Sequence, residues 1–205
     1  EDADGDGVVL IQSGTSWSFD PDDINNVDDD GDGYIDNFIG WDMADDDNNP
    51  IYPSSSLSHG TSVAGCVSGS TNNGTGIASV GWSVKLMPFR CSENGQYIEY
   101  GYNGILAAAQ MGANVINCSW GGFGGGNQSV INSAYNNYGC IIVASAGNGD
   151  ADGNTNFDYH APSALNNVIS VTATGSGDNF GCWATAGETV DLCAPGENIT
   201  TTSLG

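Results

Sequence analysis

The residues Ser58-His59-Gly60-Thr61-Ser62-Val63-Ala64-Gly65 decide how the rest of this chain is interpreted. A histidine followed by Gly-Thr and a run of small side chains predicts an imidazole in the first turn of a buried helix that packs closely on a sheet. Gly60 leaves space beside the ring. Imidazole is the natural general base near neutral pH, but a lone histidine is usually structural. Whether His59 is catalytic or structural therefore depends on the motifs further along the chain.

Apolar runs alternate with helical patterns after this segment. We expect strands over 84–89, 115–119, 141–146, 168–172 and 190–194, and helices over 100–111 and 129–138. Short apolar strands separated by helices predict an α/β fold, a mainly parallel sheet with helices on both faces. We predict one domain over 1–205, with an acidic, loop-rich segment over 1–50 and an α/β core over 51–205. Ligands of such folds bind at the carboxyl ends of the strands.

Three motifs fall at those strand ends. They are Asn117-Cys118-Ser119-Trp120-Gly121-Gly122, Ala144-Ser145-Ala146-Gly147-Asn148-Gly149 and Asp191-Leu192-Cys193-Ala194-Pro195-Gly196. The first offers a backbone edge to which an extended peptide can add as a strand. The second contains an Asn-Gly pair, which is also common in simple turns. The second histidine, His160, has no such context and is interpreted as a loop residue.

The order of these motifs resembles that of the subtilisin-like serine peptidases (subtilases), from near Asn26 to the end of the chain. The resemblance implies a subtilisin-like three-layer fold and a polypeptide substrate. It implies His59 as the catalytic base and Asn148 as the side chain that donates to the oxyanion of the tetrahedral intermediate. The residues implied in substrate binding are Ser119, Trp120, Gly121 and Gly147.

Two motifs of that family are not found. The family's aspartate lies in an Asp-Thr/Ser-Gly triplet that ends an early apolar strand, and no such triplet precedes His59. Its serine belongs in Gly-Thr-Ser-x-Ala/Ser-x-Pro, beyond Ala194-Pro195-Gly196, and the chain ends before that point. Gly14-Thr15-Ser16 resembles this motif but lies on the wrong side of His59, since a subtilase triad runs Asp, His, Ser.

Two interpretations arise from these gaps. We expect the chain to be the middle of a secreted serine endopeptidase, inactive alone because only the histidine of the triad is present. The alternative is a catalytically inactive subtilase-like domain used as a surface, filament or binding module.

Two acidic segments repeat carboxylates at alternate positions around glycines, over 2–7 and 28–36. Calcium loops need oxygen ligands and a sharp turn, which this spacing supplies. Neither segment has a glutamate at the twelfth position, so an EF-hand is disfavoured, and a solvated acidic turn is the simpler alternative. We predict structural calcium, with the ligands Asp2, Asp4 and Asp6 in the first segment and Asp28, Asp30, Asp32 and Asp36 in the second.

The charge balance is strongly acidic, with 2 Lys and Arg against 25 Asp and Glu and a net charge of -23. Such a surface repels nucleic acid and anionic membranes and attracts cations. No apolar run has the length of a membrane span, so we expect no membrane insertion. Six cysteines without a Cys-x-x-Cys pair, and only two histidines, disfavour zinc. Disulfides suit an exported or cell-surface protein, and Cys182 with Cys193 is the best candidate pair.

Overall fold

The computed structural model describes residues 2–14, 16–52, 58–149, 160–179 and 183–203. The chain forms two compact units. Unit 1 comprises residues 1–53 and 87–104, and unit 2 comprises residues 54–86 and 105–205. Unit 1 carries two sheets of two strands each, and unit 2 carries a sheet of four strands.

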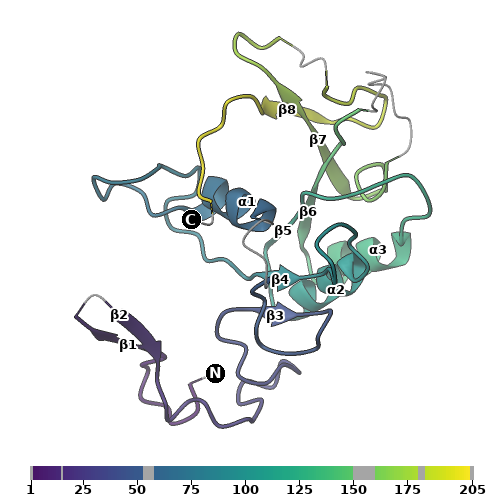
Figure 1. Cartoon of the computed structure of the whole chain (residues 1–205). Helices are drawn as coiled ribbons and strands as arrows, with labels where there is room; N and C mark the ends of the chain where they lie inside the picture. Colours follow the sequence, from purple (N-terminus) through teal and green to yellow (C-terminus); the bar gives the residue numbers. More distant parts are fainter. Residues whose placement is uncertain (1, 15, 53–57, 150–159, 180–182, 204–205) are drawn as a thin grey trace. The chain divides into compact units, whose positions relative to one another are not determined.

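Unit 1 contains a β-hairpin that no sequence pattern indicated. Strand β1 (Leu10–Ser13) pairs antiparallel with β2 (Ser16–Phe19), in the purple part of the chain in Figure 1. Gly14 lies between the two strands with φ +63°, which favours glycine at this position. The segment over 1–50 is therefore not only loop, although every residue of β1 is exposed.

The second sheet of unit 1 is small and parallel. Strand β3 (Trp41–Asp42) pairs with β4 (Phe89–Arg90), in the register Trp41 opposite Phe89. The sequence predicts a strand over 84–89, but only the last residue of this range is paired. Residues 84–88 have no strand partner in the described part of the chain, and Val84, Leu86 and Met87 are all exposed. The strand prediction is wrong here, because the apolar side chains of this run are exposed and not packed in a sheet.

Unit 2 is built on a fully parallel sheet. Its strands are β5 (Val115–Cys118), β6 (Ile141–Ser145), β7 (Val168–Thr174) and β8 (Leu192–Pro195), paired in that order. The predicted strands match these within one or two residues at each end. Cys118 lies opposite Ala144, and Ser145 lies opposite Val171. The ends of neighbouring strands therefore meet at one edge, as a parallel sheet requires.

The described residues form three helices: α1 (His59–Ser68), α2 (Gly101–Gln110) and α3 (Gln128–Asn136). All three coincide with helical segments expected from the sequence. Asn127 caps α3, because its side chain accepts a hydrogen bond from the backbone N–H of Val130 at 3.3 Å. Ile131 and Ala134 of α3 are fully buried, and the helix contacts β6.

Helix α1 is bound by a segment far along the chain. Thr202 Oγ1 donates to the carbonyl of Thr61 at 2.7 Å, and Thr201 Oγ1 donates to that of Ser62 at 2.5 Å. The yellow end of the chain runs beside α1 in Figure 1. A Cβ atom at Gly65 would overlap Thr202 Oγ1, so glycine is required for this close approach.

Among the residues that the structure describes, none of the helices is long and apolar enough to cross a membrane.

Candidate functional site

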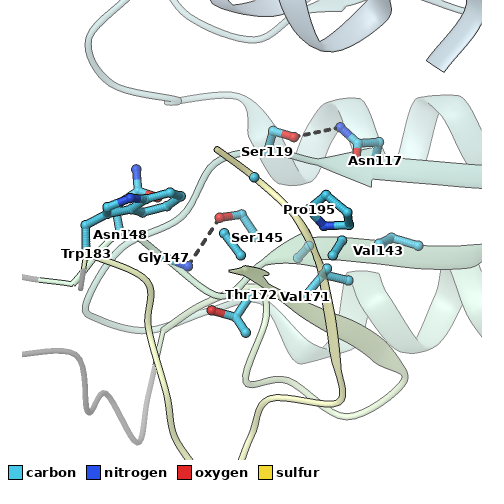
Figure 2. Close-up of a pocket in the computed structure, with 14 residues that line it drawn as sticks. Asn117, Ser119, Val143, Ser145, Gly147, Asn148, Val171, Thr172, Trp183 and Pro195 are labelled. Carbon is cyan, nitrogen blue, oxygen red and sulfur yellow. Dashed lines mark hydrogen bonds between the residues drawn. The ribbon is translucent and has the colours of Figure 1, made fainter. Parts of the chain in front are cut away.

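A pocket of about 350 Å³ lies at the carboxyl end of the four-stranded sheet in unit 2. Its walls come from all four strands and from the segments that follow each of them. Figure 2 shows Ser119, Gly147 and Asn148 around it, together with Trp183 and Pro195. The fold thus brings together three residues that the sequence motifs single out, at the edge where ligands of parallel sheets bind.

The loop after β5 forms one side of this pocket. Asn117 Nδ2 donates to Ser119 Oγ at 3.0 Å, which orients the hydroxyl (Figure 2). Gly122 and Ala161 exchange two backbone hydrogen bonds of 3.0 Å, so the loop pairs with the segment at 160–161. Two of the predicted binding residues, Trp120 and Gly121, follow Ser119 but are not among the residues that line the pocket.

The loop after β6 carries Asn148, whose side chain is exposed at the pocket. Gly147 has φ +104°, and its N–H donates to Ser145 Oγ at 3.2 Å (Figure 2). The N–H of Gly149 donates to Thr185 Oγ1 at 3.1 Å. Asn148 therefore lies between two glycines whose N–H groups are anchored, and its side chain lines the pocket.

Thr185 connects this loop to the sheet, although no sequence motif indicated it. The residue is 1% exposed, and its carbonyl accepts a hydrogen bond of 2.5 Å from Thr172 Oγ1 on β7. The Asn148 loop, Thr185 and β7 thus form one chain of hydrogen bonds. Only the position of Thr185 in the fold reveals this role.

His160 also has a larger role than that of an ordinary loop residue. Its ring lies between the two pocket loops: a Cβ at Gly121 would overlap its Cε1, and one at Gly147 would be 3.3 Å from its Nε2. Phe123 contacts the ring edge-to-face, with centroids 6.2 Å apart. The two glycines therefore leave the space that this half-buried imidazole fills.

The hydrogen bonds of His160 define its tautomer. Ser163 Oγ donates its proton to the carbonyl of His160 at 2.6 Å, so it can only accept from Nδ1, 3.2 Å away. Nδ1 therefore carries the proton in the neutral ring, and Nε2 presents a lone pair near Gly147. Burial lowers the pKa of His160 from its ordinary value, which favours this neutral form.

His59 is the first residue of α1, as predicted, but the helix is not buried as expected, because His59 is exposed and Gly65 alone of the helix is buried. It belongs to unit 2, like the pocket, but it is not among the residues that line it. The preceding Ser58 makes no side-chain capping bond. The first turn of α1 is instead held at its carbonyls by Thr201 and Thr202.

Two groups of described carboxylates lie in unit 1. Within each group, one oxygen of every residue lies within 4.8 Å of the others. One is Asp28, Asp30 and Asp32, as the spacing predicted. The other is Asp2, Asp4 and Asp23, so Asp23 stands where the spacing predicted Asp6. Asp6 accepts from the N–H of Val8, and Asp36 accepts from the N–H groups of Asn25 and Asn26. Cys193 is exposed, and Cys182 lies outside the described residues.

The chain belongs to the subtilase family, whose family model matches residues 10–205. It is 39% identical over 168 residues to thermitase from Thermoactinomyces vulgaris, covering 80% of this chain and 57% of thermitase. It is 35% identical over 158 residues to the extracellular basic protease of Dichelobacter nodosus, covering 70% of this chain and 25% of that protein.

The solved structures confirm the predicted subtilisin-like α/β fold. A protease from Pseudoalteromonas arctica PAMC 21717 superimposes with a TM-score of 0.60 and 32% identity, covering 67% of this chain and 43% of that chain. The chain therefore spans between about a quarter and three fifths of the length of these relatives.

The family match begins at residue 10, well before the start near residue 26 that the motifs suggested. Its first residues are those of β1, which continue an apolar run from Val8 and end in Gln12-Ser13-Gly14. This is an early strand that ends in x-Ser-Gly, the setting expected for the family's aspartate. Gln12 precedes Ser13-Gly14 in this segment, and its Nε2 donates to the carbonyl of Gly14 at 3.3 Å.

Proposed function

We propose that the protein containing this chain is a secreted, subtilisin-like serine endopeptidase. His59 takes the proton of a serine supplied by residues outside this chain, and that serine attacks the peptide carbonyl. Asn148 donates to the oxygen that becomes negative. The observation that carries the proposal is the pocket at the carboxyl end of the sheet, because Ser119, Gly147 and Asn148 converge there in a chain of this family.

The pocket loops provide the contacts that a peptide substrate needs. The segment from Ser119 to Gly121 offers a backbone edge beside the pocket, so an extended peptide adds to it by main-chain hydrogen bonds. The anchored glycines on either side of Asn148 fix the backbone that carries its amide, which lowers the reorganisation cost in the transition state. Secretion is supported by the relative named as an extracellular protease.

A second function is favoured by Gln12. The triad aspartate orients the imidazole and stabilises the imidazolium that forms during proton transfer. A glutamine can hydrogen-bond to the ring, but it carries no negative charge. If Gln12 occupies that position, the protein is a weakened peptidase or an inactive subtilase-like binding module that retains the peptide-binding edge.

The test is peptide hydrolysis by the full-length protein, with a fluorogenic peptide and a serine-directed phosphonate. The endopeptidase predicts turnover that the phosphonate and His59→Ala abolish. It also predicts that Asn148→Ala lowers kcat by about 10²–10³, the loss recorded for this donor in a subtilisin. The 205 residues alone should hydrolyse nothing measurable. Absence of turnover in the full-length protein, with peptide binding retained, would favour the module.

The variant Gln12→Asp separates the two functions. If Gln12 stands at the orienting position, restoring the carboxylate raises kcat, by up to about 10⁴, the cost of losing that aspartate in a subtilisin. Gln12→Asn, which restores no charge, is the matched control. An unchanged kcat in an active enzyme would mean that the orienting acid lies elsewhere.

The acidic loops are proposed as structural calcium sites. Asp28, Asp30 and Asp32 place their oxygens close enough to share one ion. Chelation should lower the thermal midpoint of the full-length protein, and calcium but not sodium should restore it.

A further inference from the structure

Asp23 is a fully buried carboxylate in a chain that has very few cations. It is 0% exposed, and its Oδ2 atom has no hydrogen-bond partner among the residues that the structure describes. Its other oxygen, Oδ1, accepts from the N–H of Ala3 at 2.8 Å. A buried carboxylate oxygen without a partner is costly unless a counter-charge lies beside it. Of the chain's two cationic side chains, the one in unit 1 is Arg90, and it pairs with Asp42 and Asp45.

Two further carboxylates face Asp23. Oxygens of Asp2 and Asp4 lie within 4.8 Å of its own, although Asp23 is distant in sequence. Calcium binds oxygen at about 2.3–2.6 Å, so two ligands of one ion can lie up to about 5 Å apart. The three oxygens are therefore spaced as ligands of a single ion, and without one their charges repel each other.

The chemistry of the donors selects the ion. All three are carboxylates, which suit calcium, magnesium or manganese rather than zinc or copper. Asp2 and Asp4 are both exposed enough to leave room for water ligands. Calcium accepts such a mixed and irregular oxygen shell, whereas magnesium demands a near-ideal octahedron.

We propose that Asp23 is the buried ligand of a calcium site completed by Asp2 and Asp4, which joins the N-terminal acidic loop to the turn after β2. The site rests on the proposal that the acidic loop binds calcium, and it does not depend on peptidase activity. In this site Asp23 is the third ligand, where the sequence spacing predicted Asp6.

The test is calorimetric titration of the chelator-treated full-length protein with calcium chloride. Asp23→Asn and Asp4→Asn should each remove the same single site, and the double variant should remove no more. Asp22→Asn, which changes the same charge at the exposed neighbouring residue, should retain every site. Asparagine keeps an acceptor for the Ala3 N–H, so the contact that holds the loop survives the change.

Each other outcome overturns the inference. If Asp4→Asn removes a site that Asp23→Asn retains, the loop binds calcium without Asp23. If both variants retain all sites, there is no site here. Should Asp23→Asn fail to fold, Asp23→Glu keeps the charge and moves the oxygens. It should weaken calcium binding at one site at least about tenfold, whereas Asp22→Glu should not, and equal affinity would overturn the inference.

Discussion

Gly121 and Gly147 illustrate how single residues shape this pocket. Neither has a side chain, and the space beside both is filled by the imidazole of His160. The His160 ring therefore lies against both loops that flank the pocket, although it belongs to neither of them. The backbone pairing of Gly122 with Ala161 adds to the same connection.

Gly121→Ala should therefore destabilise the pocket. The new methyl would overlap His160 Cε1 and lie 2.6 Å from the carbonyl oxygen of Ala161. Overpacking of this kind costs about 1–3 kcal/mol. Gly122→Ala is the matched control, because nothing lies within 4 Å of its added Cβ. Urea unfolding measures both, and equal midpoints would mean that the loop moves aside without cost.

At the level of elements, Arg90 joins β4 to β3. Its Nη1 donates to Asp42 and Asp45, and its Nε donates to the carbonyl of Ser92 at 3.1 Å. Burial lowers the pKa of Arg90, but the hydrogen bonds to the two carboxylates outweigh burial and leave the pKa raised. The guanidinium is therefore charged at any ordinary pH. Asp42 is 1% exposed, so the guanidinium supplies a counter-charge to a buried carboxylate.

Arg90→Met should leave Asp42 buried without a counter-charge. Breaking a buried pair on one side costs about 3–5 kcal/mol. Lys85→Met removes the chain's other cation at an exposed position and should change the unfolding free energy by less than about 0.5 kcal/mol. Urea unfolding followed by tryptophan fluorescence compares the two variants. Similar losses in both would mean that net charge, and not the ion pair, is responsible.

For the whole molecule, the dominant property is a net charge of -23. Carboxylates crowd unit 1, where both groups of close oxygens lie. Like charges at this density favour the expanded, unfolded chain. Bound calcium and dissolved salt oppose this repulsion by different routes.

Added salt should therefore stabilise the protein even without calcium. Raising sodium chloride from about 0.01 M to about 0.1 M shortens the Debye length from about 30 Å to about 10 Å. In excess chelator, the thermal midpoint should rise over this range. Differential scanning calorimetry measures it, with an uncharged solute at equal osmolality as the control. A midpoint that falls with salt would mean that attractive ion pairs outweigh the repulsion.

Local patterns predicted those parts of the fold whose signal is local. The continuous apolar runs at 141–146 and 168–172 became β6 and β7, and the glycines around Asn148 marked the pocket loop. The run at 84–88 failed because apolar character alone does not provide a partner strand. The early strand β1 was missed because no Asp-Thr/Ser-Gly triplet marks its end.

The remaining site residues act through contacts that span long stretches of sequence. Asp23 meets residues near the N-terminus, and Thr185 meets the loop of Asn148. His160 lies against glycines from two different loops. The sequence assigned none of the three a role in the site, because each role depends on contacts that only the folded chain makes.

The bonds from Thr201 and Thr202 to α1 also set an order of events during synthesis. They join residues 139 and 141 positions apart, so the first turn of the His59 helix cannot be secured until this late segment has been made. A ribosome adds about 5–20 residues per second, which leaves roughly 7–28 seconds between the two. Contacts of such long range also slow folding itself. The histidine helix is thus translated early and stabilised late. Throughout that interval, a nascent chain would lack both threonine hydrogen bonds to the helix.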